Sequence, residues 1–302
     1  MTATTKADIR SGQYATLDSG MRLHYASAGE PGKPLLLFVH GFPEFWGEWE
    51  EQLAEFGGDY YAVAPDMRGF NLSDMPEEVP AYKARHLIAD LQGLIGNLGY
   101  ERCIMVAHDW GGAVAWSFAI ALPQLLEKLV IVNAPHPYLF MKLLASDPAQ
   151  QQASTYMNWL RAEGSEKALA KDDFALMEKF LTGMGQSPAP WFTPEVRAKY
   201  VAAWSRGLRG GVNYYRASPL HPPGDKEPSP AGLNLNPDDF RVRVPTFVIW
   251  GEADRALLSS LLDGLDAFVP DLRIERIPEG SHWVIHEQPQ RISSLIRGYI
   301  QG

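Results

Sequence analysis

The sequence predicts an α/β fold in which helices cover both faces of a central, mostly parallel β-sheet. Seven short apolar runs show mainly continuous apolar character, as expected of strands that are buried on both faces. Helical periodicity separates most of these runs, which is typical of a doubly wound sheet. The alternation stops between about residues 138 and 241, where helix-like segments follow one another without a convincing strand. We therefore expect one sheet domain that is interrupted by a helical insertion.

The elements are expected in the following order along the chain. Strands are predicted at residues 21–29, 33–41, 59–69, 102–112, 128–137, 244–254 and 272–283. Helices are predicted at residues 45–56, 86–98, 111–122 and 292–300 around the sheet, and at 149–162, 171–181 and 193–204 in the insertion. A loop rich in Pro, Gly and Asn at residues 218–237 closes the insertion. We assign residues 1–137 and 242–302 to the core domain and residues 138–241 to an inserted helical cap.

The composition argues against several functional classes. The chain has 302 residues, with 27 Lys and Arg against 36 Asp and Glu, so binding to nucleic acid is not expected. Cys103 is the only cysteine, which excludes an intramolecular disulfide. No run approaches the about 18 apolar residues of a membrane span, and the N-terminal stretch lacks the apolar segment of a signal peptide. We expect a cytoplasmic protein whose partners are a small organic molecule and water, not a membrane.

The strand run that ends at His108 is followed by Asp109 and then by two glycines, Gly111 and Gly112. This pattern is typical of a strand–turn–helix elbow that exposes a nucleophile, because small residues permit the tight turn. Such an elbow usually presents a serine, whereas here it presents a carboxylate, which the helix N-terminus stabilises. Asp109 could instead be only the N-cap of the helix. The motif alone leaves both interpretations open.

Motifs after other strands favour a catalytic role for Asp109. The run HGFPE (His40–Glu44) follows an early strand, and Asp254 of GEAD and His282 of GSHW follow late strands. The order nucleophile, acid and histidine resembles that of the α/β-hydrolase superfamily. The resemblance extends over nearly the whole chain. The aspartate at the elbow resembles epoxide hydrolases, haloalkane dehalogenases and haloacetate dehalogenases. The resemblance implies the α/β-hydrolase fold. Glu252 is an alternative acid, but Asp254 matches the family's position.

A carboxylate nucleophile suits attack on a saturated carbon that bears a leaving group, because the displacement gives an alkyl ester. Attack on an acyl carbon would give an anhydride of high energy. The resemblance implies that His282 then activates a water, which attacks the ester carbonyl of Asp109, and that Asp254 orients His282. It also implies that the backbone N–H groups of Phe42 and Trp110 receive the oxyanion.

Two segments of the expected cap bear on the leaving group. An epoxide oxygen leaves as an alkoxide, which needs a proton donor, whereas a halide does not. The run GVNYYRA at residues 211–217 resembles the cap motif of epoxide hydrolases, in which Tyr215 takes the place of the phenol donor. Tyr156 precedes Gly164 by the spacing of a second cap motif of that family. Either tyrosine could instead be a packed aromatic residue.

We therefore predict a hydrolase that converts a hydrophobic organic epoxide to a vicinal diol, with no cofactor and no metal. A haloacetate or haloalkane dehalogenase is the alternative, because Asn158–Trp159 resembles half of the His–Trp pair of haloacetate dehalogenase caps. Phe42, Trp110, Trp159 and Trp283 are expected to line an apolar pocket, although each could belong to the core. A binding protein without turnover would not need the triad and both tyrosines together. A serine esterase is not expected, because the elbow carries no serine.

Overall fold

An eight-stranded sheet forms the centre of the molecule in a computed structural model that describes residues 6–185, 188–224 and 235–302. The strand order is β1-β2-β4-β3-β5-β6-β7-β8. β2 pairs antiparallel with both β1 and β4, and the remaining pairs are parallel, so the predicted mostly parallel sheet is confirmed. The strands are β1 (Ile9–Thr16), β2 (Arg22–Ala28), β3 (Leu35–Val39), β4 (Tyr61–Pro65), β5 (Cys103–His108), β6 (Leu126–Val132), β7 (Thr246–Gly251) and β8 (Leu272–Ile277).

The sequence did not predict β1, which is the antiparallel edge strand. Most of its residues are exposed or half-buried, so it lacks the continuous apolar character by which the other strands were found. An edge strand that faces solvent needs no such run, because only one side of it contacts a neighbouring strand. The seven strands that were predicted are all present as β2 to β8.

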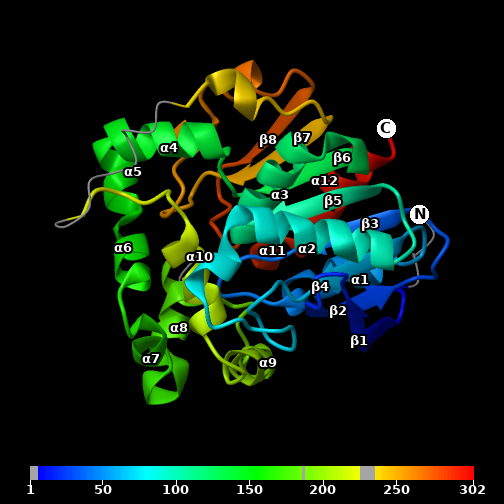
Figure 1. The fold of residues 1–302 in the computed structure, drawn as a ribbon, viewed down its shortest axis with the longest axis horizontal. Coiled ribbons are helices and arrows are strands. Elements are labelled where there is room, and N and C mark those ends of the chain that lie inside the picture. Colours follow the sequence, from blue (N-terminus) through cyan, green and yellow to red (C-terminus); the bar gives the residue numbers. More distant parts are fainter. Residues whose placement is uncertain (1–5, 186–187, 225–234) are drawn as a thin grey trace.

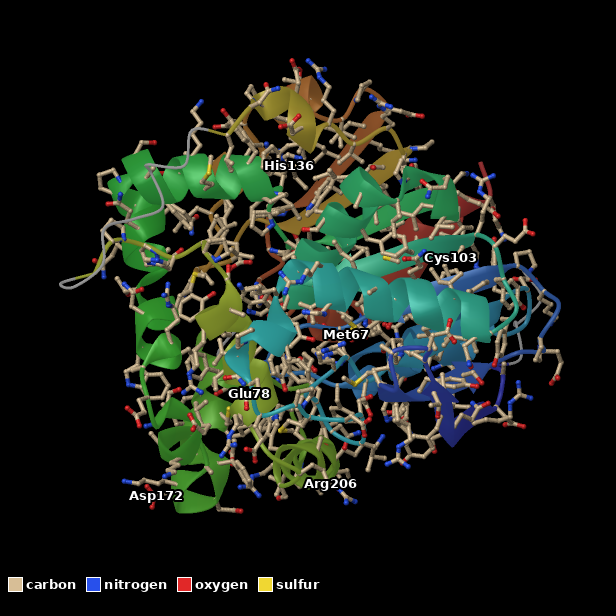
Figure 2. All side chains as sticks on the ribbon, viewed as in Figure 1. Met67, Glu78, Cys103, His136, Asp172 and Arg206 are labelled. Atoms are coloured by element: carbon tan, nitrogen blue, oxygen red, sulfur yellow. The ribbon has the colours of Figure 1, made fainter. Side chains whose placement is uncertain are left out.

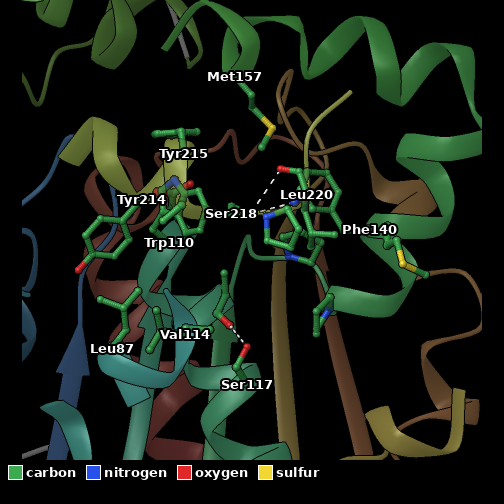
Figure 3. Close-up of a pocket in the computed structure, with 18 of the residues that line it drawn as sticks. Leu87, Trp110, Val114, Ser117, Phe140, Met157, Tyr214, Tyr215, Ser218 and Leu220 are labelled. Atoms are coloured by element: carbon green, nitrogen blue, oxygen red, sulfur yellow. Dashed lines mark hydrogen bonds between the residues drawn. The ribbon is translucent and has the colours of Figure 1, made fainter. Parts of the chain in front are cut away.

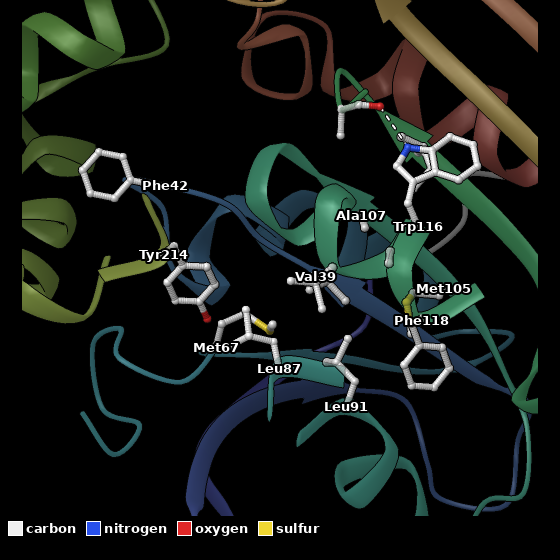
Figure 4. Packing of buried hydrophobic residues seen from close by; sticks show 14 of the residues in the cluster. Val39, Phe42, Met67, Leu87, Leu91, Met105, Ala107, Trp116, Phe118 and Tyr214 are labelled. Carbon is white, nitrogen blue, oxygen red and sulfur yellow. Dashed lines mark hydrogen bonds between the residues drawn. The ribbon is translucent and has the colours of Figure 1, made fainter. Parts of the chain in front are cut away.

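Helices cover both faces of the sheet, and alternate residues of each central strand point to opposite faces. In β3, Leu37 and Val39 belong to one apolar cluster and Leu36 and Phe38 to the other. The first cluster includes residues of α2 (Ala84–Asn97) and α3 (Asp109–Ala121), and the second includes residues of α1 (Glu50–Phe56) and α12 (Pro289–Ile300). Figure 4 shows part of the first cluster around these side chains: Val39, Met105, Leu87, Leu91, Trp116 and Phe118.

Between β6 and β7 the described chain contains helices and loops but no strand. We call residues 138–241 the cap. Its helices gather at one end of the sheet, opposite the end where both chain termini lie (Figure 1). The helices are α4 (Pro137–Ser146), α5 (Pro148–Ala153), α6 (Thr155–Arg161), α7 (Ser165–Leu169), α8 (Lys171–Gly183), α9 (Pro194–Trp204), α10 (Arg209–Ala217) and a short 3-10 turn (Pro237–Phe240).

The cap differs in detail from the sequence prediction. The single helix expected at residues 149–162 is two helices, α5 and α6, which meet at the buried Ser154. α4, α7 and α10 were not predicted as helices. Asp172 and Arg206 lie at the outer edge of the cap, whereas Cys103 lies in the sheet domain and is buried (Figure 2). Of the loop expected at 218–237, residues 225–234 lie outside the described residues.

None of the helices in the described ranges combines the length and the apolar character that a membrane crossing requires.

The turn from β5 into α3 brings the chain unusually close to the end of β3. Asp109 is the first residue of α3 and has a φ of 48°, which lies in the left-handed region that non-glycine residues rarely adopt. A Cβ atom at Gly111 would collide with the carbonyl oxygens of Val39 and His40. These contacts explain why a glycine follows Asp109 so closely.

The close approach at Gly111 predicts the effect of adding a single methyl group. Gly111→Ala is expected to lower the free energy of unfolding by about 3 kcal/mol, because the backbone of β3 would have to move. Gly96→Ala, in the exposed part of α2, is the matched control, since its Cβ would meet open space. It is expected to raise stability by about 0.5–1 kcal/mol. Urea denaturation measures both, and equal effects of the two variants would contradict the crowded elbow.

Candidate active site

Three predicted side chains that follow the ends of β5, β7 and β8 meet at one edge of the sheet. Nδ1 of His282 lies 2.7 Å from Oδ2 of Asp254, and Nε2 of His282 lies 3.6 Å from Oδ2 of Asp109. They come together because the carboxyl ends of parallel strands share one edge of the sheet. Glu252, the alternative acid, instead forms an ion pair with Arg276 on the surface. The geometry therefore favours Asp254 as the acid that contacts the histidine.

Asp254 is fixed by three further contacts, one of which comes from a residue that the sequence analysis missed. Its Oδ1 accepts hydrogen bonds from the backbone N–H groups of Ala256 (2.8 Å) and Leu257 (2.9 Å). Nδ2 of Asn133 donates to Oδ2 at 2.8 Å, and Oδ1 of Asn133 accepts from the N–H of Gly251. Asn133 is the polar residue that ends the apolar run of β6, and this was the available signal. Its amide holds the acid against the end of β7.

The carboxylate of Asp109 lies against the loop that follows β3. The backbone N–H of Phe42 donates to Oδ1 of Asp109 at 2.7 Å, and a Cβ at Gly41 would collide with the same carboxylate. Trp110 is the second residue of α3, so its N–H has no partner within the helix. Burial opposes the charge of Asp109, but the hydrogen bond and charge of His282 and the Phe42 N–H together lower the pKa of Asp109.

His282 lies between two carboxylates in a site that excludes most solvent. Its side chain is 2% exposed, and those of Asp254 and Asp109 are 0% and 11% exposed. Burial alone would lower the pKa of the imidazole, but the charges and hydrogen bonds of Asp254 and Asp109 outweigh burial and raise the pKa of His282 to about 10. In the resting site the two carboxylates therefore share one imidazolium.

A cavity of about 290 Å³ lies between Asp109 and the cap. Figure 3 shows the wall near Trp110 and Tyr215 and the opposite wall near Phe140. Among the described residues that line it, Asp109 is the only one with a charged side chain. The other lining residues are mostly apolar or aromatic, and include Leu87, Trp110, Val114, Phe140, Met157 and Leu220. The cavity suits an uncharged, apolar molecule that contacts one carboxylate.

Both predicted cap tyrosines line the same cavity as Asp109. The ring of Tyr215, on α10, packs edge-on against Trp110 and Phe42, with centroid distances of 5.0 Å and 5.5 Å. The ring of Tyr156, on α6, lies 6.2 Å from that of Tyr215. Burial and the neighbouring Asp109 raise the pKa of each phenol, so both keep their protons at neutral pH. The site thus combines one ionised carboxylate with two protonated phenols.

Close packing between the cap and the core holds α10 over the cavity. A Cβ at Gly210 would collide with the backbone of Gly69, so only glycine permits this approach. The hydroxyl of Tyr214 donates to the backbone carbonyl of Arg68 at 3.0 Å. Because Tyr215 is the next residue on the same helix, these contacts fix the depth at which its phenol enters the cavity.

Of the four predicted pocket residues, the structure places only Trp110 in the cavity wall. Trp159 is 40% exposed on α6, and Trp283 is buried behind the histidine, with its ring 4.6 Å from that of His282. Phe42 packs against Tyr215 and does not line the cavity itself. The expectation for these three side chains differs from the structure because aromatic character alone does not say which face of an element a residue occupies.

One group of side chains in the described ranges has donor atoms close enough together to suggest a metal. Atoms of Glu44, Glu48 and His286 lie within 4.8 Å of one another. Those side chains already have partners, since Glu44 contacts His286 at 3.1 Å and accepts from the hydroxyl of Tyr200, and Glu48 contacts His108 at 2.5 Å. We assign no metal to this group.

Comparison with known proteins agrees with this architecture. The profile of the alpha/beta hydrolase fold family matches residues 34–289. Epoxide hydrolase 4 of Mus musculus is 34% identical over 295 residues, which cover 94% of this chain and 77% of that protein. The AB hydrolase superfamily protein YfhM of Bacillus subtilis is 35% identical, over 94% of this chain and 96% of that protein. A crystal structure of Bacillus megaterium epoxide hydrolase with an inhibitor is similar at a TM-score of 0.86 and 32% identity, over 96% of this chain and 100% of that one.

The charge of His282 predicts how stability depends on pH. Its folded pKa of about 10 exceeds the ordinary 6.5, so its contribution to the free energy of unfolding is complete below pH 6.5 and is lost as the pH rises through about 10. The variant His282→Gln lacks this contribution at every pH. Urea denaturation should show a stability difference between wild type and variant that shrinks from pH 6.5 toward pH 10. A constant difference would contradict the shared imidazolium.

Proposed function

This chain belongs to the α/β-hydrolase fold family, and we propose that within it the chain is an epoxide hydrolase, which adds water to a hydrophobic organic epoxide to give a vicinal diol. The observation that carries the proposal is the meeting of Asp109 with Tyr156 and Tyr215 in one apolar cavity. A carboxylate attacks saturated carbon, and protonated phenols serve an alkoxide leaving group. The sequence similarity to epoxide hydrolases supports the same reaction.

In the first proposed step, an oxygen of Asp109 attacks a ring carbon of the epoxide while a tyrosine hydroxyl protonates the departing oxygen. The carbon–oxygen bond of the ring breaks, and an alkyl ester forms on Asp109. The proton that the tyrosine loses is replaced from the imidazolium of His282, which becomes neutral. Loss of the negative charge of Asp109 favours this transfer, since it removes one of the two carboxylates that raise the pKa of His282.

In the second proposed step, neutral His282 takes a proton from water as the oxygen attacks the ester carbonyl. Asp254, at 2.7 Å from Nδ1, stabilises the imidazolium that forms. The oxyanion develops on the oxygen of Asp109 that already accepts from the N–H of Phe42, and the N–H of Trp110 is the proposed second donor. Collapse expels the diol oxygen, which takes the proton of the regenerated carboxylic acid. The site returns to its resting charge state.

The dehalogenase alternative receives less support from the geometry than from the sequence. Its basis was the Asn158–Trp159 pair in the cap. Trp159 is exposed, and the amide of Asn158 donates to the carbonyls of Pro222 and Pro223 at 3.2 Å each, so this pair does not face the cavity. A halide would therefore find no donor from this pair beside Asp109.

The covalent ester predicts where isotope from water goes. In a single turnover in heavy-oxygen water, with enzyme in excess, label is expected in the side-chain carboxyl of Asp109, because water attacks that carboxyl and not the substrate. Mass spectrometry of the peptide that contains residue 109 measures it. Asp109→Asn should show no turnover and no label. Label found only in the diol would contradict the ester.

The two phenols predict a leaving-group dependence. Tyr215→Phe and Tyr156→Phe are each expected to lower kcat/KM for an epoxide by about tenfold, and the double variant by about 100-fold or more, because the alkoxide loses its proton donors. Steady-state kinetics on a terminal aryl epoxide measures this. Tyr138→Phe, which removes a hydroxyl outside the cavity, is the matched control. Release of halide from haloacids at an unchanged rate in the double variant, without epoxide turnover in the wild type, would support the dehalogenase instead.

A further inference from the structure

A chain of hydrogen bonds runs behind the candidate active site, through residues to which the proposed reaction gives no task. Nδ1 of His108 lies 2.5 Å from Oε1 of Glu48, and Nε2 of His108 lies 2.9 Å from the backbone carbonyl oxygen of His282. The side chains of His108 and Glu48 are both fully buried. His108 directly precedes Asp109, and its ring centroid is 4.8 Å from that of His282. The chain therefore links the nucleophile's turn to the loop of the histidine.

The chemistry of the two contacts fixes where the protons of His108 lie. A backbone carbonyl only accepts hydrogen bonds, so Nε2 of His108 must carry the hydrogen in its contact with His282. Nδ1 then has two options. In a neutral imidazole Nδ1 is an acceptor, and Glu48 must be a protonated acid that donates to it; in an imidazolium Nδ1 is a donor, and Glu48 must be a carboxylate.

The surroundings of Glu48 favour the protonated acid. Its second oxygen, Oε2, has no hydrogen-bond partner among the described residues, and a buried carboxylate with a bare oxygen is costly. Burial and then the charge of Glu44 raise the pKa of Glu48, and Asp109 adds to this, while the cations His286 and His282 act against it. The net effect of these groups is to raise the pKa of Glu48, so its carboxyl retains the proton.

His108 shows the matching preference for the neutral form. Burial, followed by the positive charge of His282, lowers the pKa of His108 to about 4, while Asp109 and Glu44 oppose the shift. Glu48 and His108 therefore form a buried pair of a carboxylic acid and a neutral imidazole. This pair adds no formal charge beside Asp109 and His282.

We propose that Glu48 is a positioning residue, which donates a proton in a hydrogen bond to Nδ1 of His108 and so holds His108 as the tautomer that binds the carbonyl of His282. The proposal rests on the proposed epoxide hydrolase for its kinetic consequence. Its physical effect is to fix the distance between Nε2 of His282 and Asp109 without adding a charge to the balance of the triad. No proton leaves Glu48 during the reaction.

Conservative and non-conservative variants of Glu48 separate this role from simple packing. Glu48→Gln keeps a donor for Nδ1, and kcat for an epoxide is expected to stay within about twofold of wild type, with an unchanged pH profile. Glu48→Met has a similar volume but no donor, and kcat is expected to fall by about tenfold or more, because His282 loses its support. Glu51→Gln, an exposed residue of α1, is the matched control. A Gln variant as slow as the Met variant would overturn the proposal.

Nuclear magnetic resonance of the ¹⁵N-histidine-labelled wild type tests the proton positions without any turnover. His108, assigned by comparison with His108→Gln, should show an unprotonated Nδ1 and a protonated Nε2 at neutral pH. Infrared difference spectra between wild type and Glu48→Gln should show the carbonyl band of a protonated carboxylic acid. A His108 protonated at both nitrogens, or a carboxylate band in place of the acid band, would overturn the proposal. These readouts hold even if wild type turns over no epoxide, an outcome that would refute only the proposed function.

Discussion

Two buried carboxylates share one imidazole, and the chemistry of the site depends on that balance. Asp254 holds one nitrogen of His282 at 2.7 Å, and Asp109 faces the other at 3.6 Å. While both are ionised, the imidazole keeps its proton, as its pKa of about 10 indicates. In the proposed reaction an ester neutralises Asp109, so only Asp254 remains to stabilise the charge and the imidazole becomes a usable base. In that reaction the charge state of Asp109 controls when the histidine acts as a base.

This balance requires fixed distances, and the backbone supplies them. Asp109 begins α3 in the left-handed region, a conformation that persists only where the surrounding structure enforces it. On one side, its carboxylate lies so close to Gly41 that a Cβ atom there would collide with it. On the other side, the lack of a Cβ at Gly111 lets the helix approach the backbone of β3. His108 ties the same turn to the histidine loop through a single hydrogen bond. A side chain with three constraints of this kind has little freedom to retreat from its partner, which is the condition for attack at short range.

Sequence reasoning found the features that depend on local pattern and missed those that depend on long-range contact. The parallel strands and the order of nucleophile, acid and histidine are visible because buried strands are apolar and their ends carry polar residues. The edge strand at 9–16 has no apolar run. The break between α5 and α6 at Ser154 is not marked by a glycine or a proline in the sequence. Asn133 and Glu48 contact partners far away in the sequence, so their partners cannot be read from spacing, although Asn133 stands at a strand end as a polar residue. Trp159 faces solvent because its turn of α6 points outward, which composition cannot indicate.

In the proposed reaction, the sheet domain and the cap contribute different chemical groups. Every charged member of the triad comes from loops of the sheet domain, whereas both phenols come from the cap. In the proposed reaction the core therefore supplies the groups that form and hydrolyse the alkyl ester, and the cap supplies the acid for the alkoxide. Tyr215 lines the same cavity as Asp109, and its helix α10 touches the core backbone at Gly69 and through the hydroxyl of Tyr214. Under the proposed function, the proton donor for the alkoxide is therefore positioned by contacts that hold α10 in place, at a distance from the atoms that react.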